Sequence, residues 1–343
     1  MQIPEACGPV SRRVSQVLAG RAVSPEVALA DGSLLTDRDS QLGLWMIYEL
    51  SYRGFDDVDP ALEWDPELVG LRVALERRVE HELRAATRGR VTAALQDSGQ
   101  DSGQDSGQDS GQDAGQVGEL LLRMVETDRG PQLASYLRRD ASLEQMRDYL
   151  RERSVQQLKE SDPQAFLLPR LQGSAKVALA EIQYDEFGGG RPERLHQQLY
   201  AETLAAAGLD PTYGAYVDDV SATSLASGNV MSMFGLNRRL LAAGLGHFAA
   251  FEASSSVPSR RVSAGLERLG LSDAAAYFDE HVEADAVHEQ VATQDICGAF
   301  VADHPEAWAD VIFGAACCLH LDHLSAGELL ARWQPGEGAE LAS

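Results

Sequence analysis

The segment from residue 281 to residue 288, His-Val-Glu-Ala-Asp-Ala-Val-His, places three strong metal ligands at the spacing of one helix face. His281, Asp285 and His288 stand at i, i+4 and i+7, which an α-helix at ~100° per residue brings within roughly 60° of arc. Two imidazoles and a carboxylate on one stripe suit a divalent transition metal, above all iron. The alternative is the polar face of a surface helix, but the chain has only eight histidines. We therefore predict a helix here that faces a metal site.

A second set of candidate ligands lies upstream, on either side of three consecutive glycines at positions 188–190. Glu186 precedes the glycines and His196 follows them. We predict a helix that ends near Phe187, a break at the glycines and a new helix that opens at Pro192. One glycine would be enough to end a helix, so three in a row indicate a backbone that bends sharply beside a buried site.

Together these motifs resemble the haem-oxygenase-like di-iron oxidases, a group known as iron-containing redox enzymes. The resemblance rests on Lys159-Glu160, on Glu-Ile-Gln-Tyr-Asp-Glu-Phe-Gly-Gly-Gly with the following His196, and on His-x3-Asp-x2-His. It covers roughly residues 151–333. By itself Glu160 would be interpreted as a surface acid, and only the family pattern indicates otherwise. The resemblance implies one set of residues that is both metal-binding and catalytic: Glu160, Glu186, His196, His281, Asp285 and His288.

The resemblance also implies an all-α, haem-oxygenase-like helical bundle with two Fe(II) ions, O2 as co-substrate and an external reductant, for which a small redox protein is one candidate. Three carboxylates and three imidazoles are too many for one metal and suit two, held by facing helices. Glu186 or Asp285 is expected to bridge the ions. Glu252 is an acid on an otherwise apolar helix, so it either caps that helix outward or faces the metal cavity.

The composition agrees with an all-helical chain. Apolar residues make up 44% of the 343 residues, enough for a sizeable core, and aromatic residues only 6%. No stretch alternates as a strand does, and no glycine-rich nucleotide-binding motif follows one. The formal net charge of −24 repels phosphate groups, so we expect neither nucleic acid nor an anionic membrane as a partner. A small-molecule substrate is expected, and a homodimer is left open.

The four cysteines, Cys7, Cys297, Cys317 and Cys318, form no CxxC pair. Reduced thiols of this kind fit the cytoplasm. The N-terminus has no cationic start followed by an apolar stretch, so no signal peptide is expected. The longest uncharged apolar run, residues 311–319, is far shorter than the ~20 residues needed to cross a bilayer. We therefore expect a cytoplasmic protein.

The sequence divides into an additional N-terminal helical region, residues 1–96, and the haem-oxygenase-like di-iron domain, residues 117–334, with a disordered tail at 335–343. Between the two regions, residues 97–116 repeat Asp-Ser-Gly-Gln four times and then Asp-Ala-Gly-Gln. Such a repeat buries almost no apolar surface to offset the entropy of ordering. We interpret it as a flexible acidic linker, with helices resuming at Val117.

Caps and prolines mark several helix starts. Asp65-Pro66 opens a long helix, because the aspartate can cap it and proline suits its first position. Ser142 is a further candidate cap. Pro258 is expected to open another helix, and Ser272 to cap the helix that carries the His-x3-Asp-x2-His motif and runs to about His304.

The function implied by the resemblance is that of a non-haem di-iron, O2-dependent oxygenase acting on a small amine or amino-acid-like substrate, with secondary metabolism as one setting. N-oxygenation is the first choice, beside desaturation and oxidative C–C cleavage. One alternative is a non-catalytic iron- or haem-binding protein on the same scaffold, although haem oxygenase relies on a single proximal histidine. Another is a thiaminase-like hydrolase, for which Cys297 is the candidate nucleophile.

Overall fold

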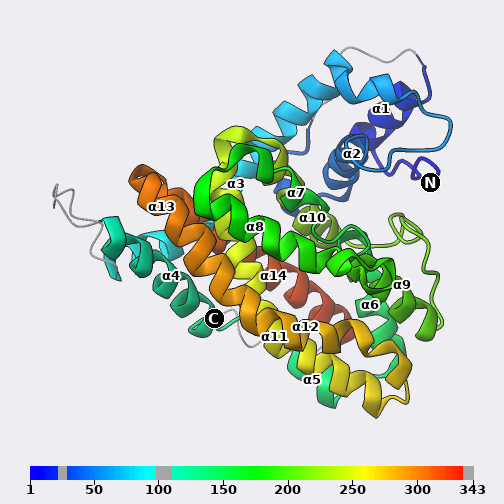
Figure 1. The fold of residues 1–343 in the computed structure, drawn as a ribbon. Coiled ribbons are helices and arrows are strands. Elements are labelled where there is room, and N and C mark those ends of the chain that lie inside the picture. Colours follow the sequence, from blue (N-terminus) through cyan, green and yellow to red (C-terminus); the bar gives the residue numbers. More distant parts are fainter. Residues whose placement is uncertain (22–28, 98–109, 335–343) are drawn as a thin grey trace.

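The computed structural model describes residues 1–21, 29–97 and 110–334, and within these residues every regular element is helical (Figure 1). The expected all-α fold class is confirmed. The α-helices are α1 (Pro9–Leu18), α2 (Arg38–Glu49), α3 (Pro66–Asp97), α4 (Ser110–Glu126), α5 (Leu133–Arg139), α6 (Leu143–Gln157), α7 (Asp162–Ala165), α8 (Gly173–Glu186), α9 (His196–Ala206), α10 (Ala222–Leu236), α11 (Leu241–Arg268), α12 (Ala276–Gln290), α13 (Ala299–Asp303) and α14 (Trp308–Trp333), with a π-helix at Val291–Gly298.

Two predicted helix starts are confirmed, together with their capping chemistry. Pro66 is the first residue of α3, and the Oδ1 atom of Asp65 accepts hydrogen bonds from the backbone N–H groups of Glu67 (2.9 Å) and Leu68 (3.1 Å). Ser142 caps α6 in a reciprocal box with Gln145. In both cases side-chain oxygens bind backbone donors that lack a partner within the helix.

The long helices α11 and α14 pack against each other in the centre of the molecule (Figure 1). Their backbones approach closely because each contributes a glycine at the crossing. A side-chain carbon on Gly246 would overlap the carbonyl of Val311, and one on Gly314 would overlap the carbonyl of Ala243. These glycines therefore fix the distance between the two helices on which much of the core is built.

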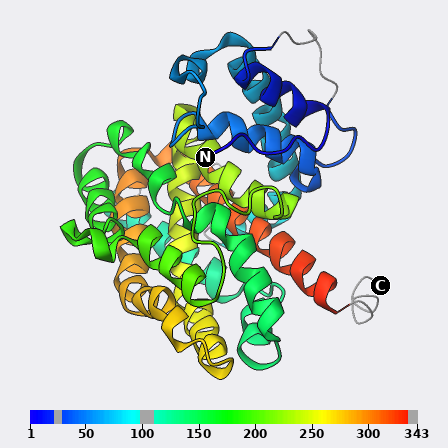
Figure 2. The ribbon, with the colours of Figure 1, turned by 90° about the vertical axis from the view of Figure 1, so that its right-hand side faces the viewer.

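The N-terminal region joins the rest of the molecule through a shared core. Helices α1 and α2 lie at one end of the molecule in both Figure 1 and Figure 2. Helix α3 runs back along α14, and its Leu75, Val79 and Leu83 belong to the same buried cluster as Phe313 and Cys317. Burial of these apolar side chains ties the N-terminal region to the last helix.

Three helix boundaries differ from the prediction. Helix α11 continues through Pro258 instead of beginning there. Helix α9 begins at His196, after a single 3-10 turn at Pro192–Arg194. The helix that carries His281 and His288 begins at Ala276, after a 3-10 turn at Ser272–Ala274, so Ser272 does not cap it. It ends at Gln290, and the chain continues as a π-helix and then as α13.

Helix α4 begins at Ser110, seven residues earlier than the predicted restart at Val117, so the end of the tetrapeptide repeat is helical. The predicted linker character of residues 98–109 and the predicted tail at 335–343 lie outside the described residues. Among the residues that the structure does describe, no helix combines the length and apolarity needed to span a membrane.

Candidate metal centre

Four of the predicted ligands form one buried group. Glu160, Glu186, His196 and His281 each offer an atom, and these atoms all lie within 4.8 Å of one another. Each of the four residues is no more than 5% exposed. Charged and ionisable groups are rarely buried at this density unless they are paired or bind a metal.

Glu160 follows the last turn of α6 and precedes a residue in an unusual conformation. Ser161 has a φ of 67°, in the left-handed region that residues other than glycine seldom occupy. Its hydroxyl donates a hydrogen bond of 3.0 Å to Oε2 of Glu186. The strained turn thus places the Glu160 carboxylate and a donor to Glu186 side by side.

The three glycines connect the next two ligands. Glu186 is the last residue of α8 and His196 the first of α9, and Nδ1 of His196 lies 2.9 Å from Oε2 of Glu186. All three glycines have positive φ angles, of 80°, 60° and 80°. A side chain at Gly188 would also collide with the backbone of Arg194 and Leu195. The prediction that the glycines bend the chain at a buried site is confirmed.

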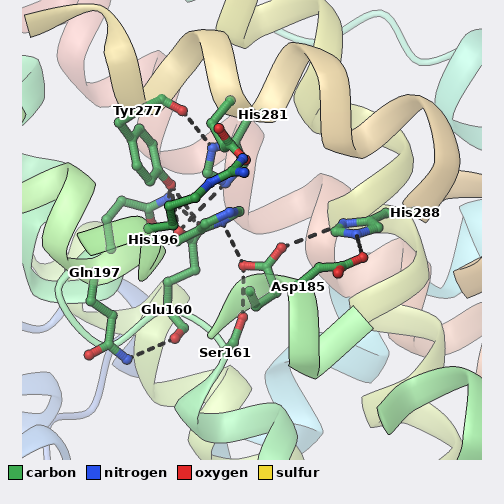
Figure 3. A network of polar contacts seen from close by, with 12 residues as sticks. Glu160, Ser161, Asp185, His196, Gln197, Tyr277, His281 and His288 are labelled. Atoms are coloured by element: carbon green, nitrogen blue, oxygen red, sulfur yellow. Dashed lines mark hydrogen bonds and ion pairs between the residues drawn. The ribbon is translucent and has the colours of Figure 1, made fainter. Parts of the chain in front are cut away.

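His281 comes from α12 with its ring held in one orientation. Its Nδ1–H donates a hydrogen bond of 2.8 Å to the carbonyl of Tyr277, which leaves Nε2 directed at the group, 3.6 Å from Oε2 of Glu160. The Tyr277 hydroxyl contacts both oxygens of Glu160 at 2.8 Å, and Gln157 donates to Oε1 at 3.0 Å (Figure 3). In metal sites, a histidine that binds the ion through one ring nitrogen usually donates a hydrogen bond from the other.

A second group shares one member with the first. Atoms of Glu186, Glu252 and His288 also lie within 4.8 Å of one another. Nδ1 of His288 is 3.5 Å from Oε1 of Glu186 and 3.4 Å from Oε2 of Glu252, while its Nε2 is 3.4 Å from the half-exposed Asp185. Figure 3 shows His288 beside Asp185 on one side of the network, and His196, His281 and Tyr277 on the other. Glu186 therefore stands between two ligand groups.

The structure decides the open question about Glu252. The residue is 5% exposed and its side chain lies against His288, so it faces the centre instead of capping α11 outward. Asp285 is on the described helix α12, but its side chain lies outside the described residues. Its place beside His281 and His288 stays a prediction from helical spacing.

Electrostatic coupling within the two groups is strong. Burial alone would raise the pKa of Glu186, but His196, His281 and His288 lower it to about 2. For His288, burial would lower the pKa, yet Glu252 and Glu186 outweigh burial and raise it to about 9. Burial raises the pKa of Glu252. Without a metal, protonated imidazoles thus occupy the place of cations among the carboxylates.

The donor set fits transition-metal ions. Among the described residues, Nδ1 of His196 and Nδ1 of His288 are buried and have no aligned hydrogen-bond partner, although carboxylate oxygens lie close to both. A buried imidazole nitrogen that faces carboxylates without a hydrogen bond is a vacant donor atom. Three imidazoles and three carboxylates suit iron, manganese or zinc better than calcium or magnesium, which prefer oxygen ligands alone.

Contacts from the N-terminal region hold both ligand turns. Nη2 of Arg53, just beyond α2, donates to the carbonyl of Leu158 at 3.2 Å and to Oε1 of Gln197 at 2.7 Å. Gln197 in turn donates to the carbonyl of Glu160 at 2.9 Å. One guanidinium group therefore connects the turn before Glu160 with the first turn of α9, which carries His196.

Of the residues that hold the ligands in place, only one could have been identified from the sequence. Tyr277 stands four positions before His281, so the helix period could have placed it on the ligand face. Nothing in the sequence marks Ser161, Gln197 or Arg53, because their contacts depend on the tertiary packing of separate segments. Their roles become visible only in the folded chain.

Cys297, the nucleophile of the hydrolase alternative, lies in the π-helix as a fully buried member of the apolar core. Burial raises the pKa of its thiol far above the ordinary value, so the thiol stays neutral. A neutral thiol packed in the core is a poor nucleophile. The structure gives no support to the hydrolase alternative.

The helical bundle with its buried carboxylate–imidazole cluster defines a class of protein that could bind a metal between facing helices. A sequence model of a family described as iron-containing redox enzyme matches residues 147–323, a little over half of the chain. The chain belongs to this family, and its haem-oxygenase-like, all-α fold agrees with that membership. The family description fits an iron-dependent oxidoreductase. No curated protein matches the chain.

Proposed function

We propose that this protein is a non-haem di-iron, O2-dependent oxidoreductase that acts on a small amine or an amino acid, with N-oxygenation as the first candidate reaction. The observation that carries the proposal is the position of Glu186, whose carboxylate belongs to two buried ligand groups at once. A carboxylate shared by two ligand sets is the arrangement that holds two metal ions close together.

The ligands divide between two ions. Glu160, His196 and His281 would hold one ion, and Glu252 and His288 the other, with Glu186 between them. Asp285 would add a further carboxylate to the His288 side if it follows the helix period. Two ferrous ions, when bound, would supply the electrons for the reduction of O2, and an external reductant, for which a small redox protein is our candidate, would restore them.

The surrounding side chains orient the ligands and control protons. Burial and the adjacent Glu160 raise the pKa of Tyr277 well above that of an ordinary tyrosine, so its Oη stays protonated and donates a hydrogen bond to the Glu160 carboxylate. The carbonyl of Tyr277 holds Nδ1–H of His281 and thereby directs Nε2 inward. Arg53 and Gln197 fix the turns that carry Glu160 and His196. These contacts keep the donor atoms in place before any metal arrives.

Oxygen uptake tests the proposal. Metal-free protein is loaded anaerobically with Fe(II) or, as a matched control, with Zn(II), and is then mixed with O2, a reductant and a panel of amines and amino acids. We expect O2 consumption that depends on Fe(II) and accelerates with one class of panel member. Iron that binds but gives no substrate-dependent O2 uptake would favour the non-catalytic iron-binding alternative.

A further inference from the structure

A cavity of about 630 Å³ borders the metal centre on its Glu160 side. Glu160, Tyr277 and His281 contribute to one part of its wall, and the remainder comes mainly from α5, α6, α11 and α14. This volume suits a small organic molecule. If the proposed function holds, this cavity is where the substrate meets the metal centre, and its other lining residues decide which substrate enters.

One wall of the cavity is a stripe of α6 that leads to the metal centre. Tyr149, Arg153 and Gln157 line it at intervals of four residues, and Glu160 lines it from the turn that follows α6. On a helix such residues share one face. At a rise of 1.5 Å per residue, Arg153 lies about 6 Å from Gln157 along this stripe, and Gln157 donates a hydrogen bond to Glu160. A group held at Arg153 is thus one long side chain away from the metal ligands.

The guanidinium group of Arg153 places a positive charge on this wall. Within the part of the chain that the structure describes, no hydrogen bond or ion pair to its guanidinium group is present. Burial alone would lower the pKa of Arg153, but Tyr149 and Asp322 outweigh burial and raise it. A half-buried guanidinium without a fixed partner is suited to bind a carboxylate through two parallel hydrogen bonds.

The α14 part of the cavity wall carries an acidic side chain. Cys318, Asp322 and Ser325 line the cavity from α14 at helical spacing. Among the described residues Asp322 also has no hydrogen bond or ion pair; burial raises its pKa, and the longer-range field of Arg153 lowers it. Asp128 lines the cavity too, but Arg90 and His323 already bind it. Asp322 is therefore free to accept a hydrogen bond from a cationic group.

We propose that the cavity binds the zwitterionic head group of an α-amino acid, with its carboxylate on Arg153 and its ammonium on Asp322, and directs the side chain to the metal centre. The two charges face one cavity without closing on each other, so a dipolar head group can insert between them. A ligand with only a carboxylate would pair with Arg153 alone, and a ligand with only an amine would pair with Asp322 alone. Phe278 and Leu319 add apolar wall for the side chain. Oxidation of that side chain at the metal centre rests on the proposed function, whereas binding of the head group does not.

Calorimetric titration of the full-length protein, loaded with Zn(II) so that no turnover occurs, tests the assignment. The probes are L-norleucine, hexanoate, which lacks its ammonium group, and 1-pentylamine, which lacks its carboxylate. We expect L-norleucine to bind at least tenfold more tightly than either fragment. Arg153→Gln should weaken L-norleucine and hexanoate at least tenfold, and Asp322→Asn should weaken L-norleucine to a similar degree while leaving hexanoate unchanged.

The control is Arg151→Gln on the same helix, whose side chain pairs with Asp148 and does not line the cavity. This variant should bind L-norleucine as the wild type does. Arg261 also lines the cavity, so a loss of L-norleucine binding in Arg261→Gln but not in Arg153→Gln would overturn the assignment. Equal affinity for L-norleucine and hexanoate in the wild type would overturn the role of Asp322, and the absence of L-norleucine binding would overturn the site.

The two proposals fail in different experiments. Head-group binding is measured on Zn(II)-loaded protein without O2, so it can succeed even if the iron-loaded protein consumes no O2. That result would reject the oxygenase function and keep the binding site. Conversely, O2 uptake driven by amines that lack a carboxylate, together with no binding of L-norleucine to the Zn(II)-loaded protein, would keep the function and reject the head-group assignment.

Discussion

Replacing Glu252 by glutamine tests the division of the centre into two ligand groups. Glu252 contacts His288 and belongs only to the second group, whereas the first group has four other donors. We expect Glu252→Gln to keep the iron held by Glu160, His196 and His281 and to lose most of the other. Iron content after anaerobic loading and desalting should fall from about two to about one per chain.

The change should not unfold the metal-free protein. A pKa raised from 6.5 to about 9 corresponds to a net gain of about 3 kcal/mol for protonated His288, left after burial has opposed the attraction of its carboxylates. Glu252 makes the largest favourable contribution to this gain, so its replacement removes a large part of it. Burial penalises the Glu252 carboxylate itself, as its raised pKa shows, and glutamine relieves that penalty. The net loss should therefore be on the order of 1 kcal/mol.

The assay compares Glu252→Gln with Glu267→Gln, an exposed glutamate on the same helix α11. Iron per chain is measured by chelation after denaturation, and thermal melting of the metal-free variants checks the fold. The control should bind two irons and melt as the wild type does. Two irons in Glu252→Gln, or loss of both irons from a folded variant, would refute the division into two groups that share Glu186.

Three further predictions concern the same centre. The His288 pKa is raised on folding, so its stabilising contribution is complete below pH 6.5 and disappears as the pH rises through about 9; metal-free wild type should lose thermal stability over that interval, and His288→Gln should show a flatter profile. Asp285→Asn should lower the iron content while Glu283→Gln does not, because helical spacing puts Glu283 on the opposite side of α12; equal iron content would reject the helix-face argument. Arg53→Met should weaken iron binding by about 10- to 100-fold without loss of helicity, and unchanged affinity in an equilibrium titration would show that the turns need no such support.

The local features of the centre could be predicted from the sequence because each depends on a few neighbouring residues. Helical spacing was enough to put His281 and His288 on one face. The glycine run was enough to place a bend between Glu186 and His196, and all three glycines indeed adopt positive φ angles. The position of Glu160 came from the family resemblance alone, since nothing in its immediate sequence distinguishes it from a surface acid.

Features that depend on packing between distant segments could not be predicted in this way. Pro258 removes a backbone donor, which favours a break by about 3 kcal/mol. Helix α11 nevertheless continues through it, because α11 packs along α12 and α14. The inward position of Glu252 has the same origin, since it depends on how α11 is rotated against α12.

The most direct test of the account is the number of ferrous ions that the folded protein binds. Metal-free wild-type protein is titrated anaerobically with Fe(II) to saturation, and bound iron is measured per chain after rapid removal of the free metal. The shared position of Glu186 predicts saturation at two irons per chain. Saturation at one iron or fewer, in protein that circular dichroism shows to be folded, would contradict the two-metal centre.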